Sequence, residues 1–108
     1  MKGRLYAALL EDLKIMRWHA NLARGSLITA DVYLRRLGNF CETSKITPDK
    51  LVSLDEDALH DLLLDTVTRM ERNYTGSYTK SVIKALKSWL SHNGIARAQR
   101  PLFSTLIH

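Results

Sequence analysis

The sequence has little of several residue types on which whole classes of protein depend. Its 108 residues contain one cysteine, five glycines and two prolines. A single cysteine, Cys41, excludes an internal disulfide framework, and we expect a reducing, cytoplasmic environment. The glycines form neither a phosphate-cradling loop nor a dinucleotide-binding fingerprint. The longest apolar run near the N-terminus, residues 6–10, is too short for a signal peptide or a membrane span.

Acidic residues are missing from the last third of the chain. Residues 74–108 hold five Lys and Arg and no Asp or Glu. Residues 53–73 hold two basic and six acidic residues, and residues 1–52 hold nine basic and five acidic residues. The net charge of +5 is therefore strongly segregated along the chain. Segregated positive charge suits a surface that binds a polyanion. A solvated basic helix with no partner would show the same charge count.

Hydrophobic periodicity is the strongest structural signal that is present. Apolar residues recur at three- and four-residue spacing and predict four main helices, at residues 4–22, 29–42, 54–72 and 77–92. Thr47-Pro48 predicts a single helical turn before the third of them. No segment alternates with the period of a strand. We therefore predict an all-α, compact four-helix bundle over residues 1–95, with residues 96–108 as a tail or the start of a linker.

Capping residues and apolar stripes define these helices in detail. Thr29, Ser53 and Ser77 are the expected N-caps of the second, third and fourth helix. Asn93-Gly94 is the expected C-cap of the last one, with Ile95 folding back onto it. The expected apolar stripes are Leu5, Leu9, Leu13, Met16 and Ala20; Tyr33, Leu34, Leu37, Phe40 and Cys41; Leu59, Leu62, Leu63, Val67 and Met70; and Val82, Ile83, Leu86, Trp89 and Leu90.

The outward face of the last helix carries the clearest functional pattern. Three ammonium groups and four hydroxyls recur there at steps of three and four residues. Lysine supplies charge and serine supplies short hydrogen bonds to phosphate oxygens, and the helix N-terminus favours an anion. This face is predicted to contact a polyanion. Its residues are Ser77, Lys80, Ser81, Lys84, Lys87, Ser88 and Ser91.

Other charged and aromatic residues are weaker candidates. Arg35, Arg36 and Lys45 could extend the basic surface of the last helix. Asp31 and Glu42 lie near Arg35 at helical spacing, however, and ion pairs with them would neutralise its charge. Trp18 and Trp89 are expected to be core aromatics. Flanking the turn into the last helix, Tyr74 and Tyr78 suit either a DNA backbone or the core. An acidic stripe on the third helix is expected to face solvent; its residues are Asp57, Asp61 and Asp65.

The residues that perform catalysis are sparse. The four histidines are scattered, no two of them have a metal-binding helical spacing, and no second cysteine joins them. There is no nucleophile elbow. We expect a chain that is not an enzyme, with no cofactor and no metal.

The order of these signals resembles the N-terminal core-binding domain of the tyrosine recombinase, or phage integrase, family. The resemblance covers about residues 18–95 and consists mostly of core-face positions. A departure occurs at Tyr78, where the family often has an arginine, which puts base-edge readout from this position in doubt. The matching residues are Trp18, Ser26-x-x-Thr29, Tyr33-x-x-x-Leu37-x-x-Phe40, Thr47-Pro48, Gly76-Ser77, the run Ser81 to Leu90, and Asn93-Gly94-Ile95.

The resemblance implies a SAM-like orthogonal bundle that clamps one side of duplex DNA opposite a separate catalytic domain. Its implied partners are duplex DNA, a recombinase catalytic domain in the same parent chain, and other recombinase protomers, with no membrane. The alternative from the residues alone is a helical protein–protein adaptor, of the SAM or death-domain kind, with a basic partner-binding face. The implied or inferred DNA-binding residues are Ser77, Thr79, Lys80, Ser81, Lys84, Lys87, Arg35, Arg36, Lys45 and, in the tail, Arg97.

Overall fold

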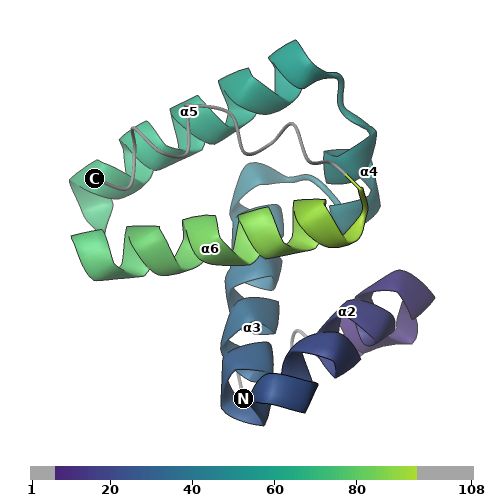
Figure 1. Cartoon of the computed structure of the whole chain (residues 1–108). Coiled ribbons are helices and arrows are strands. Elements are labelled where there is room, and N and C mark those ends of the chain that lie inside the picture. The colour runs from purple at the N-terminus through teal and green to yellow at the C-terminus, as the bar shows by residue number, and fades with distance from the viewer. Residues whose placement is uncertain (1–6, 95–108) are drawn as a thin grey trace.

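A computed structural model describes residues 7–94, and these residues form helices with no β-strand among them. The predicted all-α class is confirmed, and residues 7–94 contain four long helices, as predicted. Those four are α2, α3, α5 and α6. A short helix, α4, lies between α3 and α5, and a 3-10 helix, η1, precedes α2 (Figure 1). Their bounds are η1 Ala7–Glu11, α2 Leu13–Gly25, α3 Leu27–Ser44, α4 Pro48–Ser53, α5 Glu56–Asn73 and α6 Gly76–His92.

Only two of the long helices lie side by side; the others cross them at steep angles (Figure 1). In Figure 1, α5 and α6 form an antiparallel pair, α3 crosses α6 steeply, and α2 packs at the other end of α3. The principal extents of the molecule are 30 × 28 × 27 Å. Helix α3 contacts both α2 and α6, so it joins the two halves of the bundle.

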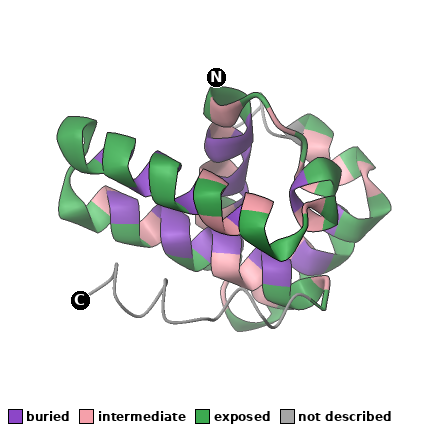
Figure 2. Cartoon of the chain, turned by 90° about the horizontal axis from the view of Figure 1, so that it is seen from above, coloured by how far each residue is buried: buried purple, intermediate pink, exposed green. Residues whose placement is uncertain are grey.

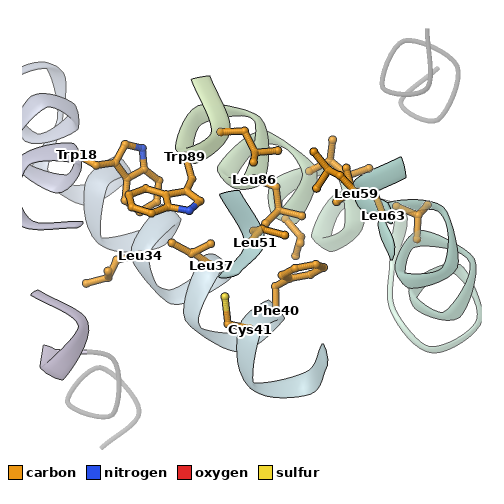
Figure 3. Close-up of a cluster of buried hydrophobic side chains, with 14 of the residues drawn as sticks. Trp18, Leu34, Leu37, Phe40, Cys41, Leu51, Leu59, Leu63, Leu86 and Trp89 are labelled. Carbon is orange, nitrogen blue, oxygen red and sulfur yellow. The ribbon is translucent and has the colours of Figure 1, made fainter. Parts of the chain in front are cut away.

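One hydrophobic core lies where these helices meet (Figure 3). At one end of it the rings of Trp18 and Trp89 meet edge to face, with 5.3 Å between centroids (Figure 3). Their indole N–H groups are both satisfied, by the Ser88 hydroxyl at 2.9 Å and by the carbonyl oxygen of Pro48 at 3.3 Å. Both tryptophans are core residues, as predicted. The six residues from three helices expected to be buried together are all in this core: Leu37, Phe40, Leu63, Val67, Leu86 and Leu90.

The first predicted helix is wrong in both extent and orientation. Asp12 interrupts the predicted helix. Its carboxylate accepts hydrogen bonds from the backbone N–H groups of Lys14 and Ile15, and α2 therefore begins as a separate helix. Leu9, in η1, packs against the core as expected, but the part of the expected inner stripe that lies in α2 faces outward: Leu13 is 53% exposed and Met16 is 46% exposed. Ile15, Trp18 and the half-buried Leu22 point inward instead. A tryptophan buries more apolar surface than leucine or methionine, so its position decides which face of α2 is inside.

Three predicted N-caps are also wrong, each by a few residues. Ser26 caps α3 and accepts the backbone N–H of Thr29 at 3.1 Å, so the helix starts at Leu27. Asp55 caps α5 through the backbone N–H of Ala58 at 2.8 Å, whereas Ser53 ends α4. The reason is shared: the sequence offers several cap-forming residues at each turn, and the local backbone selects one of them. The third cap, on α6, is Thr75, whose hydroxyl accepts the N–H of residue 78.

Two turn predictions are confirmed. Thr47 caps α4, which opens with Pro48 as expected. The cap residue after α6 is Asn93, and Gly94 has a φ of +79°, the left-handed conformation that glycine adopts without strain. Leu5, the contact of Ile95 and the whole tail from residue 96 lie outside the described residues. Among residues 7–94, no helix combines the length and hydropathy that a membrane crossing requires.

Candidate nucleic-acid interface

Helix α6 is positioned by its own buried face. Val82, Ile83 and Leu86, together with Trp89 and Leu90, are each at most 1% exposed. Their packing against the rest of the bundle fixes the rotation of the helix, and the opposite stripe therefore faces solvent. Exposed positions gather on the outer faces of the helices in Figure 2. On α6 the exposed members of the predicted stripe are Ser77, Lys80, Lys84 and Ser91.

The cations of this stripe are placed for one continuous anionic partner. Lys80 and Lys84 are exposed and make no ion pair with any of the residues 7–94. One helical turn separates them, about 6 Å along the axis. Lys87 lies one further turn along; it is half-buried and has an interaction within the chain. Because α6 contains no carboxylate, no acid on the same helix neutralises this charge.

One edge of the predicted stripe is covered by neighbouring helices. Arg36 of α3 donates from Nε to the Ser81 hydroxyl at 3.2 Å. The Ser88 hydroxyl accepts the indole N–H of Trp18. Both serines are half-buried, so the open face is narrower than the sequence predicted. Arg36 joins this face as a fourth cation, held at its border by α6 itself.

Thr79, expected from the resemblance to contact DNA, does not lie on this face. Its side chain is 5% exposed, and its hydroxyl donates to the carbonyl oxygen of Thr75 at 3.2 Å. The step of two residues from Ser77 turns it by about 200° around the helix, into the interior. The predicted contact from Thr79 is therefore wrong.

The remaining predicted cations are less closely associated with α6. Arg35 is half-buried on α3 beside Arg36. Lys45 is exposed at the C-cap of α3, with a φ of 56°. Asn39 contacts α6 through Tyr78. Lys45 comes six residues after Asn39, which corresponds to roughly 9 Å of helix. It therefore lies beyond the crossing of the two helices. The predicted contact from Arg97 falls outside the described residues.

A small aromatic and cationic cluster at the start of α6 was not predicted as a unit. The rings of Tyr74 and Tyr78 stack with 4.7 Å between centroids. Arg36 lies over the Tyr78 ring at 4.6 Å, and the Asn39 side-chain amide donates to the Tyr78 hydroxyl. Tyr74 lies outside α6, at the C-cap of α5 with an extended backbone, so helical spacing does not predict the stacking of the two tyrosines. Their contact with α3 depends on how the helices cross, which no local pattern encodes.

The acidic stripe of α5 lies on the opposite side of that helix from its core residues. Asp57, Asp61 and Asp65 are all exposed, as predicted. Asp65 forms an i, i+4 ion pair with Arg69, with 3.6 Å between Oδ2 and Nε. Because the inner face of α5 packs in the core, these three aspartates point away from the bundle.

The described residues with nucleophilic or ligand side chains are dispersed. Burial raises the pKa of the Cys41 thiol to about 12, so the thiol stays protonated at neutral pH and is a poor nucleophile. Residues 7–94 contain no group of three His, Cys, Asp or Glu side chains that could hold a metal ion. His19 contacts Asp31 at 2.8 Å, and this pair links α2 to α3.

Comparison with known proteins gives no relative. No protein-family profile matches the sequence. Neither a curated protein nor a solved structure matches the chain significantly.

Proposed function

We propose that this chain is a duplex-DNA-binding module that contacts phosphates through the outer face of α6. The observation that carries the proposal is the pair Lys80 and Lys84, exposed one turn apart with no ion pair among residues 7–94. Lys87 and Arg36 border the same face. Phosphate contacts of this kind position a protein on a duplex without reading its sequence.

Three further features support DNA as the polyanion. Helix α6 has 17 residues, about 25 Å, which is enough to lie along a groove or across a backbone. The exposed hydroxyl of Ser77 lies in its first turn, at the positive end of the helix dipole. Asp57, Asp61 and Asp65 lie on the side of α5 opposite its core residues, so we expect them to repel a duplex seated on α6 only weakly.

The module is proposed to act beside a separate catalytic domain, in DNA integration or site-specific recombination. This part of the proposal depends on the resemblance to the tyrosine recombinase core-binding domain. The steep crossing of the helices and the burial of Trp18, Leu37 and Phe40 support it, because the resemblance consists mainly of such core positions. In that role the chain binds DNA and does not itself catalyse a reaction.

A matched pair of double variants tests the DNA face. Lys80→Ala with Lys84→Ala removes two charges from α6, and Lys14→Ala with Lys50→Ala removes two exposed charges elsewhere. If each α6 lysine neutralises one phosphate, the first variant weakens duplex binding roughly 60-fold at about 0.1 M salt, because each contact contributes about 0.9 to the salt exponent. The second leaves affinity within about 3-fold. Fluorescence anisotropy with a labelled random duplex measures both. Equal affinities for the two variants would contradict the proposal.

One observation favours the adaptor alternative. The outer face of α2 exposes Leu13, Met16 and Ala20 on one helical stripe, and exposed apolar stripes occur at protein interfaces. In that case Leu13→Gln with Met16→Gln abolishes association with a protein partner, while duplex DNA binds neither the wild type nor the variant. Duplex binding that survives these two changes and is lost with the α6 lysines favours the DNA module.

A further inference from the structure

A cavity of about 150 Å³ lies between α3 and α5, beside the turn into α6. Three buried side chains form its floor: Phe40, Thr66 and Met70 are 1%, 4% and 7% exposed. Two of them supply apolar surface and the third supplies a hydroxyl. The floor is therefore suited to a small group that is mainly apolar but has a polar edge.

The Thr66 hydroxyl has no hydrogen-bond partner among the described residues. A threonine inside a helix can satisfy its hydroxyl by bonding the carbonyl oxygen four residues earlier. Thr68 does so, to Leu64 at 2.9 Å, and Thr79 does so, to Thr75 at 3.2 Å. Thr66 makes no such bond, although it lines the cavity. A buried hydroxyl left unpaired is unfavourable, and because the Thr66 side chain lines the cavity, rotation about its χ1 would turn the hydroxyl toward a ligand there.

The mouth of the cavity adds groups that can bind the edge of a ring. Asn39, Asn73 and Arg69 line it. The amide nitrogen of Asn39 donates to Tyr78, and that of Asn73 donates to the carbonyl oxygen of Arg69 at 3.0 Å. Each carboxamide oxygen is an acceptor that a ligand can use, and the Arg69 guanidinium is a donor. Acceptors and donors therefore stand around one opening.

Tyr74 supplies an aromatic wall at this mouth. Its side chain is 48% exposed, yet its ring is held in place by stacking on Tyr78. Tyr78 is fixed in turn by Arg36 and Asn39. A tyrosine that is both ordered and exposed is a good surface for stacking a planar ring, because little side-chain entropy remains to be lost.

We propose that this cavity binds one planar, single-ring heteroaromatic group, a pyrimidine base. The floor packs against the ring, Tyr74 stacks on it, and Thr66, Asn39, Asn73 and Arg69 bind its edge. A volume of about 150 Å³ is enough for a single benzene-sized ring. The base is either that of a free nucleoside or an unpaired base of a DNA strand. The second source rests on the proposed function, because Arg36 links this cluster to the DNA face of α6.

Three variants distinguish a cavity that binds a ring from a cavity that holds only water. Thr66→Val keeps the shape and removes the hydroxyl. Thr66→Leu fills the cavity. The control, Thr68→Val, removes an exposed hydroxyl from the same helix. Thermal unfolding first establishes which variants keep the fold; Thr66→Val is expected to do so because it leaves no unpaired hydroxyl.

The first experiment titrates the full ¹⁵N-labelled chain with thymidine by NMR. We expect the backbone amide signals of Thr66, Asn73 and Tyr74 to shift, and those of Lys80 and Lys84 to stay. Thr66→Val should weaken thymidine binding at least about 5-fold, and Thr68→Val should leave it unchanged. Absence of shifts at the cavity, or equal affinity in wild type and Thr66→Val, would overturn the free-nucleoside site.

The second experiment compares a fully paired duplex with one that carries a single unpaired thymine. Base stacking on an aromatic side chain predicts at least about 5-fold tighter binding of the second duplex, and Thr66→Leu or Thr66→Val should remove the difference. No preference, together with no thymidine binding, would overturn the proposed cavity ligand while leaving lysine-dependent duplex binding intact. Thymidine binding without any duplex binding would instead support the cavity and contradict the proposed function.

Discussion

Trp18 and Trp89 set the orientation of two helices, because each buries a large ring and an N–H group that needs an acceptor. Trp18 donates to Ser88, and Trp89 donates to the backbone of Pro48. These two bonds join α2 to α6 and α6 to α4. At this scale the sequence was informative about burial: both tryptophans were predicted to be core residues. It could not identify their acceptors, which come from distant parts of the chain.

Leu86 tests the core directly. It is 1% exposed and belongs to the cluster that includes Leu37 and Phe40. Leu86→Ala should lower the free energy of unfolding by about 2–5 kcal/mol, because it removes buried methyl groups and leaves a cavity. Urea denaturation followed by circular dichroism measures the change. A loss below about 1 kcal/mol would mean that the residue is not packed as described.

Cys41 should be inert in the folded protein. It is buried in the core, and its raised pKa of about 12 leaves almost no thiolate at pH 8. An aromatic disulfide reagent should therefore label it at least about 100-fold more slowly than it labels the urea-unfolded chain. Comparable labelling rates with and without urea would show that the thiol is accessible.

At the scale of the element, α2 shows the limit of periodicity. Its sequence contains two apolar stripes on opposite sides, one through Leu13 and Met16 and the other through Ile15 and Trp18. Counting apolar positions selected the first stripe, but the structure buries the second. The choice depends on which side chains fit between α3 and α6, and this is a property of tertiary packing. Helices α3, α5 and α6 each have one dominant stripe, and their buried faces were predicted correctly.

Paired substitutions on α2 check this correction. Ile15→Ala should destabilise the fold by about 2–5 kcal/mol, since Ile15 is 2% exposed. Met16→Ala, at 46% exposure, should change stability by less than about 1 kcal/mol, because its side chain is already largely in water. Urea denaturation of the two variants side by side gives the comparison. The reverse order would restore the orientation that periodicity predicted.

The exposed face of α6 was predicted only in part, because local spacing indicates which residues face outward but not which of them neighbouring helices cover. Its outward cations Lys80 and Lys84 follow from helical spacing alone, once the buried stripe is known. Thr79 was misplaced because its contact came from a resemblance and not from its angular position on the helix. The covering of Ser81 and Ser88, and the cavity beside Tyr74, depend on where α3 and α2 cross α6. No single segment of sequence carries that information.

For the whole molecule, acidic and basic charge are concentrated on different helices, the acids on α5 and the lysines on α6. The aspartates Asp57, Asp61 and Asp65 are exposed on the side of α5 opposite its core residues, although a short turn joins α5 to α6 and the two helices pack as a pair. Such separation produces a directional field that steers a polyanion to one side of the protein. We expect neutralising the α5 face, by Asp57→Asn with Asp61→Asn, to tighten duplex binding by less than about 3-fold. A larger gain would place that face against the DNA.

The salt dependence of duplex binding tests the central claim most directly. If Lys80, Lys84 and Lys87 each neutralise a phosphate, they together contribute about −2.7 to the slope of log K against log salt. The Lys80→Ala/Lys84→Ala variant should flatten the wild-type slope by about 1.8 and keep its helical circular dichroism, whereas Lys14→Ala/Lys50→Ala should keep the wild-type slope. Anisotropy titrations between about 0.05 and 0.2 M salt give all three slopes. A folded α6 variant whose slope and affinity equal those of the wild type would contradict the assignment of this face to DNA.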